Sequence, residues 1–376
     1  MKLASLELTD FRNYKDAQIA CGPGINFVIG RNAQGKTNLL EAIYLLCFSK
    51  SFRTRYDKEA IAFQQPFFLI KGNFQSEHGN VHRLVLRCDH QSGKEILIDR
   101  KRIQKTSELL GKFPIVVSSP DEYAVTIGPP PERRKLVDIL LSQLHQNYFS
   151  NLQEYHRILQ QRNAILSNWK SSGAITTAVL DPWNQRLLDT GTQIMSYRFE
   201  FSKAFSIIIN QIYSEFIRSE ETVSFRYRAN IEFDHIEDLK DRFEIKIGQL
   251  QKAEIRAGVT LAGPHRDDFI FEVNGKELKK YGSRGQHKTV LIALAMAEAK
   301  MLQEQLSEQP IILIDDLFSE LDSDRAQQIL DHLTKVGQVF VTATNMPKIV
   351  ASTQNRYFMV ENGKIELIDE NALTAH

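Results

Sequence analysis

The sequence lacks most of the features that mark secreted, membrane or metal-scaffold proteins. Its three cysteines (Cys21, Cys47 and Cys88) are scattered, without the C-x-x-C spacing of a zinc or redox motif. No apolar run approaches the roughly 20 residues that a membrane helix needs. The first residues also lack the apolar core of a signal peptide. We therefore expect a soluble protein of the cytoplasm with no membrane-spanning part.

The sequence also lacks an excess of either charge. Its 47 lysines and arginines are nearly balanced by 46 aspartates and glutamates, which gives a net charge of +1. Composition therefore offers no general argument for nucleic-acid binding, and any such contact must come from a local basic patch. The length of 376 residues and the hydrophobic content of 42% fit a globular protein of two or three domains.

A complete phosphate-binding motif stands near the start of the chain. Residues 30–37 read Gly-Arg-Asn-Ala-Gln-Gly-Lys-Thr, which matches the pattern G-x-x-x-x-G-K-[ST]. Residues 25–29 before it predict a buried strand, and the residues from Lys36 onward predict a helix. The apolar face of that helix consists of Leu39, Ile43, Leu46 and Cys47. This order of strand, loop and helix is the context in which the motif binds a nucleoside triphosphate.

Each part of the motif has a chemical role. Gly30 and Gly35 allow the backbone to curl so that successive N–H groups point at phosphate oxygens. Lys36 can reach the β- and γ-phosphates, and the Thr37 hydroxyl can bind Mg²⁺. We expect a nucleoside triphosphate with Mg²⁺, bound by the loop residues Gly30, Arg31, Asn32, Ala33, Gln34, Gly35, Lys36, Thr37 and Asn38.

A pair of acids follows a second apolar run. Residues 311–314 are Ile-Ile-Leu-Ile, and Asp315 and Asp316 come directly after them. A buried parallel strand delivers acids to its carboxyl end, where ligands collect. We predict that Asp315 holds the Mg²⁺ hydration shell and that Asp316 orients or deprotonates the attacking water, with Lys36 as the other catalytic residue. The alternative is a strand that simply ends in an acidic turn.

A second anion site is predicted where Ser283, Arg284, Gly285 and Gln286 precede a helix. A serine hydroxyl and a helix N-terminus exposed at a glycine can bind a phosphate. One nucleotide has little use for two such sites in one chain, whereas two chains facing head to tail would each cap the γ-phosphate held by the other. Asp322 would lie at the same interface, or it would only cap the helix that follows it.

The secondary-structure pattern of the chain changes twice. Strand-like runs dominate the first third, with examples at 67–70, 83–88, 95–103 and 114–117, of which 95–103 reads as a hairpin with a basic tip. A capping box at 119–122 predicts a helix start, and long amphipathic helices follow, with one strand at 223–227. The end returns to strands at 311–316 and 339–344. We predict an α/β P-loop head made of 1–125 with 257–376, and a mainly helical second lobe at 126–256.

The ordered set of motifs resembles the ATP-binding-cassette ATPases of chromosome maintenance and, within them, the RecF family. The shared motifs are Phe11-Arg12-Asn13-Tyr14, Gly35-Lys36-Thr37-Asn38, Ser119-Pro120-Asp121, Arg133-Arg134, Gln161-Arg162-Asn163, Gly263-Pro264-His265-Arg266-Asp267-Asp268, Asp315-Asp316 and Ser319-Glu320-Leu321-Asp322. The match spans the whole chain, and the motif at 263–268 is specific to that family.

This resemblance implies a structure and a function. It implies an SMC-like ATPase head with a helical lobe, ATP as the nucleotide, and a homodimer that forms with ATP. It also implies DNA binding at single-strand gaps, work with RecO and RecR in recombinational repair, replication restart and the SOS response, and a weak DNA-dependent ATPase used as a switch. Arg12 and Asn13 match the family's adenine-proximal segment.

Three positions depart from related ATPases. Asp316 matches the RecF family but stands where many cassette ATPases have a glutamate, and the shorter side chain fits slow turnover. Thr344 takes the place of the histidine that senses the γ-phosphate in transporter-type cassettes, which puts that role in doubt here. Ser118 and Ser119 stand where related ATPases carry a glutamine near the metal.

Several charged groups have weaker meanings. The predicted contacts to the DNA backbone are Arg53, Arg55, Arg100, Lys101 and Arg102, with Arg133, Arg134 and Lys135 as further candidates. Such clusters are also common on ordinary solvated faces. His265, Asp267 and Asp268 allow a metal site, but a structural turn with buried hydrogen bonds is the preferred interpretation.

Two other functions compete with a DNA-repair switch. A transporter's nucleotide-binding subunit is disfavoured by Thr344 in place of the histidine and by the length of the helical insertion. A small-molecule P-loop kinase would not need the motif at 283–286 or the loop at 319–322.

Overall fold

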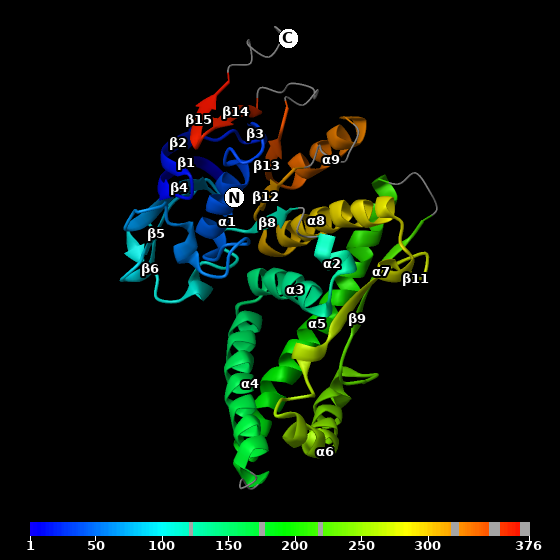
Figure 1. Ribbon diagram of the computed structural model, residues 1–376. Coiled ribbons are helices and arrows are strands. Elements are labelled where there is room, and N and C mark those ends of the chain that lie inside the picture. The colour runs from blue at the N-terminus through cyan, green and yellow to red at the C-terminus, as the bar shows by residue number, and fades with distance from the viewer. Residues whose placement is uncertain (120–122, 173–176, 217–220, 317–322, 346–353, 369–376) are drawn as a thin grey trace. The chain divides into compact units, whose positions relative to one another are not determined.

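The computed structural model describes residues 1–119, 123–172, 177–216, 221–316, 323–345 and 354–368. They form two compact units: unit 1 consists of residues 1–122 with 291–376, and unit 2 of residues 123–290 (Figure 1). The predicted lobes differ from these units mainly at the second boundary, because residues 257–290 belong to unit 2. The reason is strand pairing: β10 (Asp268–Val273) pairs along its whole length with β9 (Val223–Arg228).

One sheet of unit 1 is antiparallel, and its described strands have the order β2-β1-β4-β5-β6-β7. The strands are β1 Lys2–Phe11, β2 Tyr14–Ala20, β4 Phe67–Gln75, β5 Val81–Asp89, β6 Gly93–Ile98 and β7 Lys101–Arg102. Buried and half-exposed residues alternate along most of β4, as expected of a sheet packed on one face. The predicted hairpin at 95–103 is confirmed as β6 and β7, which are joined by a turn at Asp99 and Arg100 with positive φ at both residues.

The other sheet of unit 1 is mainly parallel, with the described order β15-β14-β3-β13-β12-β8. Its strands are β3 Ile25–Ile29, β8 Ile115–Ser118, β12 Ile311–Ile314, β13 Gln338–Ala343, β14 Arg356–Glu361 and β15 Lys364–Leu367. Every residue of β3, β12 and β13 is buried, which is typical of parallel strands covered on both faces. These strands were predicted along with β8, whereas β14 and β15 were not.

Helix α1 (Lys36–Phe48) contacts strands of both sheets. The sequence pattern predicts a single apolar face, but every residue from Leu39 to Cys47 is buried. A helix that is apolar nearly all round belongs inside a protein, and α1 forms one core with side chains of the two sheets. The phosphate-binding loop is therefore anchored directly to the centre of unit 1. Helix α9 (Ser323–Val336) packs against β13.

Unit 2 is mainly helical, as predicted. Its helices are α2 Tyr123–Ile127, α3 Pro130–Leu144, α4 Gln146–Ser172, α5 Asp181–Phe216, α6 Leu239–Ala257, α7 Leu278–Tyr281 and the first turns of α8 Arg284–Leu306. A described sheet of order β11-β10-β9, with β11 at Lys276–Glu277, packs on α5 through β9. Most of the helix start predicted at 119–122 lies outside the described residues. None of the described helices combines the length and apolarity needed to cross a bilayer.

Ion pairs are buried in the interior of unit 2. Arg162 on α4 and Glu254 on α6 are fully buried, with Nη2 of the arginine 2.6 Å from Oε2 of the glutamate. Arg162 also donates to Asn184 Oδ1 at 2.9 Å and to Thr260 Oγ1 at 2.8 Å. A buried charge left without its partner is strongly destabilising, because its lost hydration is no longer compensated. This cluster therefore ties α4, α5 and α6 together.

The substitution Arg162→Ala should lower the free energy of unfolding by about 3–5 kcal/mol, because it leaves the Glu254 carboxylate buried and unpaired. Both tryptophans, Trp169 and Trp183, lie in unit 2, so fluorescence during urea unfolding reports on this unit. The control is Arg157→Ala, which removes an exposed ion pair and should cost less than about 1 kcal/mol. Equal losses in the two variants would contradict this account.

Candidate nucleotide site

The carboxyl ends of β3, β12 and β13 lie side by side in the parallel sheet. Beside them and the start of α1 is an open cavity of about 510 Å³. Its lining residues are Asn32, Ala33, Gly35, Lys36, Thr37, Asn38, Arg53, Asp315, Asp316 and Thr342. The structure therefore brings the predicted loop and the predicted aspartates together, although Thr37 and Asp315 are 278 positions apart.

The loop conformation explains both of its glycines, but for different reasons. Gly35 has φ of 121°, a value that L-residues rarely adopt, and a Cβ there would lie 2.6 Å from the Asn13 side chain. Gly30 is needed for packing, since a Cβ there would lie 2.3 Å from the carbonyl oxygen of Val360 on β14. Of the two glycines, only Gly35 therefore has the positive φ that the curled loop requires, a conformation that Ala33 also adopts with φ of 64°.

Neighbouring turns hold the loop in this shape. Asn13 Nδ2 donates to the carbonyl oxygen of Gln34 at 2.7 Å, and the Tyr14 hydroxyl donates to the carbonyl oxygen of Gly35 at 2.8 Å. The N–H of Gly363, at the turn between β14 and β15, donates to the same Gln34 carbonyl at 3.2 Å. Burial raises the pKa of Tyr14 above its ordinary value, so its hydroxyl remains a donor. Asn13 thus supports the loop, and its direct role with a nucleotide stays a prediction.

Lys36 points its ammonium group at the loop itself. Nζ donates to the carbonyl oxygens of Gly30 at 2.6 Å and Arg31 at 3.0 Å. Partial burial lowers the pKa of Lys36 below its ordinary value, and the carboxylates of Asp315 and Asp316 act in the opposite direction. A half-buried ammonium held by neutral carbonyls can exchange those contacts for stronger, charge-assisted bonds to phosphate oxygens.

Asp315 is the meeting point of the site. Its carboxylate accepts from the Thr37 hydroxyl, at 2.8 Å to Oδ2, and from the Thr342 hydroxyl, at 2.7 Å to Oδ1. Asp316 follows with φ of 59°, and its N–H donates to Thr342 Oγ1 at 2.8 Å. Thr342 is not part of any motif in the sequence. Thr344, which stands where transporter-type cassettes have a histidine, is exposed beyond the end of β13.

The residues at this site fit a magnesium–nucleotide complex. The Thr37 hydroxyl and the Asp315 carboxylate are the hard oxygen donors that Mg²⁺ prefers, and they are in contact with each other. The N-terminal turn of α1 contains no acidic residue that would repel phosphate. Among the described residues, no cluster of three or more His, Cys, Asp or Glu side chains could hold a metal on its own. A magnesium ion here would therefore share its coordination with phosphate oxygens and water.

Arg12 and Arg53 converge on a buried acid beside this cavity. Glu41 on α1 is fully buried, and Arg12 binds it with Nε at 2.9 Å and Nη2 at 2.6 Å. Arg53 Nη1 lies 3.6 Å from the same carboxylate and donates to Asn38 Oδ1. Arg12 is thus engaged in holding α1. Arg53, which the sequence predicted as a DNA contact, lines the nucleotide cavity, and its contact with DNA stays a prediction.

The predicted second anion site lies at the start of α8 in unit 2. Ser283 and Gln286 form a reciprocal cap: the Ser283 N–H donates to Gln286 Oε1 at 2.9 Å, and the Gln286 N–H donates to Ser283 Oγ at 3.2 Å. Gln286 Nε2 also donates to Glu221 at 2.9 Å. Ser283, Arg284 and Gly285 are exposed. Asp322 lies outside the described residues.

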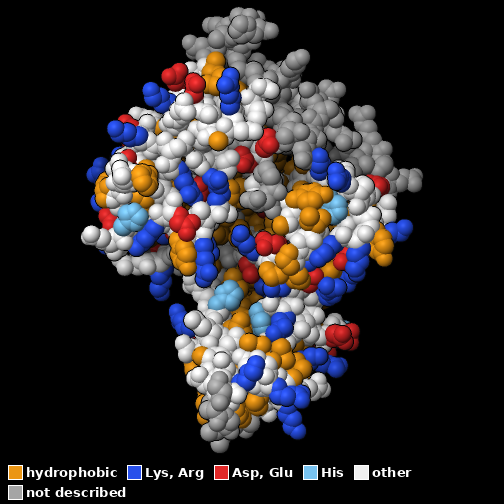
Figure 2. Space-filling view, in the orientation of Figure 1, with side chains coloured by type: hydrophobic (Ala, Val, Ile, Leu, Met, Phe, Trp, Pro, Cys, Tyr) orange, Lys and Arg blue, Asp and Glu red, His pale blue; other side chains and the backbone are white. Residues whose placement is uncertain are grey.

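The basic residues predicted to contact DNA have different environments. Arg55, Arg100, Lys101 and Arg102 are exposed, and Arg102 lies 3.4 Å from Glu95. Figure 2 shows that positive and negative side chains are interspersed over the visible face of the molecule. These four residues therefore stay predictions that geometry does not rank.

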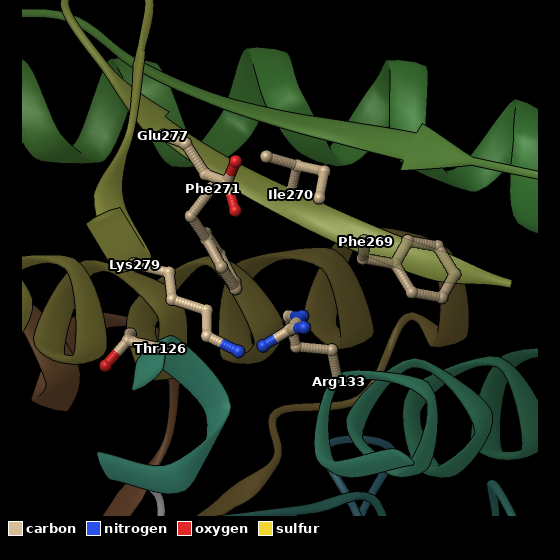
Figure 3. Close-up of a pocket in the computed structure, with 7 residues that line it drawn as sticks. All are labelled: Thr126, Arg133, Phe269, Ile270, Phe271, Glu277 and Lys279. Atoms are coloured by element: carbon tan, nitrogen blue, oxygen red, sulfur yellow. The ribbon is translucent and has the colours of Figure 1, made fainter. Parts of the chain in front are cut away.

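The prediction that Arg133 contacts the DNA backbone is wrong, because this side chain is buried inside unit 2. Its Nε and Nη2 bind the Asp268 carboxylate at 2.8 and 3.1 Å. Figure 3 shows Arg133 and Lys279 pointing into the same small cavity below β10, and both donate to the Gly128 carbonyl at 2.9 Å. With a volume of about 10 Å³ the cavity is no larger than a water molecule needs.

The motif at 263–268 forms the structural turn that was preferred to a metal site. His265 Nδ1 lies 2.7 Å from the Tyr155 hydroxyl, and Asp267 accepts from Arg198 at 3.0 Å and from the Asn230 N–H at 2.8 Å. Burial lowers the pKa of His265 to about 4, so it is neutral near pH 7. The motif lies wholly within unit 2.

The fold and this site define a class: a P-loop nucleotide-binding protein with a head of the SMC type. The Smc head bound to the C-winged helix domain of ScpA has a similar fold, with a TM-score of 0.57 at 14% identity over the full length of both chains. At that identity the likeness concerns the fold alone.

The chain belongs to the RecF/RecN/SMC N-terminal domain family, whose model matches residues 2–366. Within it, the chain is similar to the DNA replication and repair protein RecF of Chloroherpeton thalassium, with 36% identity over 92% of this chain and 95% of that one. RecF of Ligilactobacillus salivarius is 32% identical over 100% and 99% of the two chains. The structure of the recombination mediator protein RecF with ATP has a TM-score of 0.90 at 28% identity, covering 98% and 97% of the chains.

We expect Arg53→Ala to weaken ATP binding about tenfold, the effect of losing one charge-assisted contact worth about 1.5 kcal/mol. The control is Arg55→Ala, because Arg55 is exposed and is not among the residues that line the cavity. Titration calorimetry with an ATP analogue that is not hydrolysed measures both variants. An unchanged affinity in Arg53→Ala would mean that Arg53 does not reach the nucleotide.

Proposed function

We propose that the chain is an ATP-dependent DNA-binding protein of recombinational repair and replication restart. In this proposal it binds ATP and Mg²⁺, dimerises head to tail around two nucleotides and loads at single-strand gaps or junctions. Slow, DNA-dependent hydrolysis then resets it. The full-length similarity to RecF proteins supports this function. The solved RecF relatives are described as recombination mediators of the RecFOR pathway, which supports RecO and RecR as partners.

The contact between Thr37 and Asp315 is the observation that carries the nucleotide part of the proposal. It joins the hydroxyl of the phosphate-binding loop to the acid at the end of β12 at 2.8 Å, beside Lys36 and a cavity of about 510 Å³. Bound Mg²⁺ would supply charge neutralisation between the β- and γ-phosphates. Thr37 and Asp315 would hold it, Lys36 would donate to the phosphates, and Asp316 would orient the attacking water or take its proton.

The dimer part rests on the exposed start of α8. The Ser283 hydroxyl accepts a hydrogen bond from Gln286 and can still donate its own proton, and Arg284 is exposed beside it. The N-terminus of a helix of 23 residues favours an anion. We assign Ser283, Arg284 and Gly285 to the γ-phosphate held by a second chain, with Gln286 bracing the turn through Glu221. Asp322 completes this assignment as a prediction.

The two alternative functions receive less support. A transporter subunit and a small-molecule kinase both share the phosphate loop, but curated relatives of near full length at 32–36% identity are RecF proteins. The cytoplasmic location and the preference for gapped DNA stay predictions. ATP-gated binding to a gapped duplex, compared with plain duplex and single strand, distinguishes a repair factor from either alternative.

Lys36→Ala should reduce ATP affinity at least 100-fold, because several charge-assisted bonds to phosphate are lost together. Lys50→Ala is the control, since Lys50 is an exposed lysine just after α1. Fluorescent-nucleotide titration measures both, and gapped-DNA binding should fall with ATP binding in the first variant only. Retained ATP binding in Lys36→Ala would remove this site from the proposal.

Light scattering with ATP and Mg²⁺ tests the opposed dimer. The wild type should double in mass with nucleotide, whereas Ser283→Ala and Arg284→Ala should bind ATP and stay monomeric. A monomer under every nucleotide condition would refute the dimer.

Asp316→Asn should accumulate as an ATP-bound dimer with at least tenfold slower hydrolysis. Asparagine keeps the size of the side chain and tolerates the positive φ, but it cannot act as a base. Unimpaired hydrolysis in Asp316→Asn would exclude the base role.

A further inference from the structure

Thr342 lines the cavity, although no sequence motif identifies it. It lies near the end of β13, one position beyond Val341, which pairs with Ile314 at the end of β12. The parallel register therefore sets Thr342 level with Asp315 on the neighbouring strand. Thr342 is fully buried, although it belongs to the lining of the cavity. Its side chain is thus held in one place by the sheet.

The hydrogen bonds of this hydroxyl have a defined direction. Oγ1 carries one proton and can accept through its lone pairs. The backbone N–H of Asp316, 2.8 Å away, is a donor only, so Oγ1 accepts from it. The hydroxyl proton is then donated to Asp315 Oδ1 at 2.7 Å, because an ionised carboxylate only accepts. One hydroxyl therefore connects the two consecutive aspartates.

The first consequence concerns the carboxylate plane of Asp315. Thr342 donates to Oδ1, and Thr37 donates to Oδ2 at 2.8 Å. Thr37 Oγ1 also lies 3.1 Å from Oδ1. The two hydroxyls together restrict the rotation of the carboxylate, and its remaining lone pairs can accept from metal-bound water. Partners of this kind orient a metal-binding carboxylate and are commonly worth 10- to 100-fold in metal affinity, an order-of-magnitude figure.

The second consequence concerns the backbone of Asp316. Its φ of 59° lies in the left-handed region, which is uncommon for residues other than glycine and which a neighbouring contact can stabilise. The bond from its N–H to Thr342 is such a contact. The same hydroxyl therefore sets the direction in which the Asp316 side chain leaves the main chain.

We propose that Thr342 is a positioning residue for ATP hydrolysis: its hydroxyl sets the Asp315 carboxylate for Mg²⁺ and the Asp316 backbone for the attacking water. This inference rests on the proposed function and adds to it the residue that couples the metal acid to the base. Thr342 does not touch the reacting atoms. Its removal should affect magnesium dependence and turnover while leaving metal-free nucleotide binding intact.

The test compares four variants of the full chain. Thr342→Val keeps the branched shape without the hydroxyl, Thr342→Ala is a second hydroxyl-free variant, and Thr342→Ser restores the hydroxyl. Thr344→Val is the matched control, two residues further on and exposed. The readouts are Mn²⁺ binding by electron paramagnetic resonance with an ATP analogue that is not hydrolysed, ATP binding in EDTA, and kcat against Mg²⁺ concentration.

In Thr342→Val we expect Mn²⁺ affinity about 10- to 100-fold weaker, a half-saturating Mg²⁺ concentration raised to match, and at least tenfold lower kcat. ATP affinity in EDTA should stay within about threefold of wild type, and Thr342→Ser should recover most of the loss. If Thr342→Val failed to fold, Thr342→Ala would decide by the same readouts.

Three results would overturn the proposal. The first is wild-type Mn²⁺ affinity in both hydroxyl-free variants. The second is a loss of Mn²⁺ affinity in Thr342→Ser as large as in Thr342→Val, which would indicate a packing effect, and the third is a loss of the same size in Thr344→Val. Failure of the proposed function looks different, because the wild type itself would then bind no Mn²⁺ with the nucleotide analogue. The inference about Thr342 would fall with it.

Discussion

The carboxylate of Asp315 is the contact on which the rest of unit 1 depends. It accepts a hydrogen bond from the hydroxyl of Thr37 at the start of α1, at 2.8 Å, and another from the hydroxyl of Thr342 on β13, at 2.7 Å. These contacts bring together three segments that are far apart in sequence and come close only because β12 lies beside β13 in a parallel sheet. These contacts therefore form only when β12 and β13 are paired, so nucleotide binding should depend on that pairing and on the packing of α1.

Because α1 is buried, Thr37 at its start is held in place. The burial of α1 also places the charged side chain of Glu41 in the core. Glu41 is a fully buried carboxylate in the middle of the core, a position that needs compensating partners. The bidentate contact from Arg12 and a hydrogen bond from Ser51 provide them. Arg12 and Tyr14 come from the same short stretch, so the turn between β1 and β2 holds both the helix and the loop before it. The loop is thus preorganised by neutral donors and one buried ion pair.

Features that a short stretch of residues determines could be predicted from the sequence, whereas features that depend on contacts between distant residues could not. The phosphate loop, β12 and the helices of unit 2 each follow from a short pattern of residues. Thr342 could not be identified in this way, because the role of a threonine in a buried strand depends on which residue of the neighbouring strand lies beside it. Arg133 failed for the same reason: its partner Asp268 is 135 positions away and turns an apparent surface cation into a core residue. Arg53 shows the limit most clearly, since only the fold places it at the nucleotide cavity.

The start of α8 indicates how the residues of one motif divide their tasks. Both polar ends of the Gln286 side chain have partners inside unit 2, one on Ser283 and one on Glu221. Glu221 is in turn bound by the Tyr213 hydroxyl at 3.0 Å, which links the motif to the end of α5. Gln286 therefore braces the turn, and in the proposed dimer Ser283, Arg284 and the backbone of the first turn would be the groups that bind the anion. Gln286, Glu221 and Tyr213 thus form a chain of hydrogen bonds from the first turn of α8 to the last turns of α5 (Asp181–Phe216), and this chain fixes the Gln286 side chain.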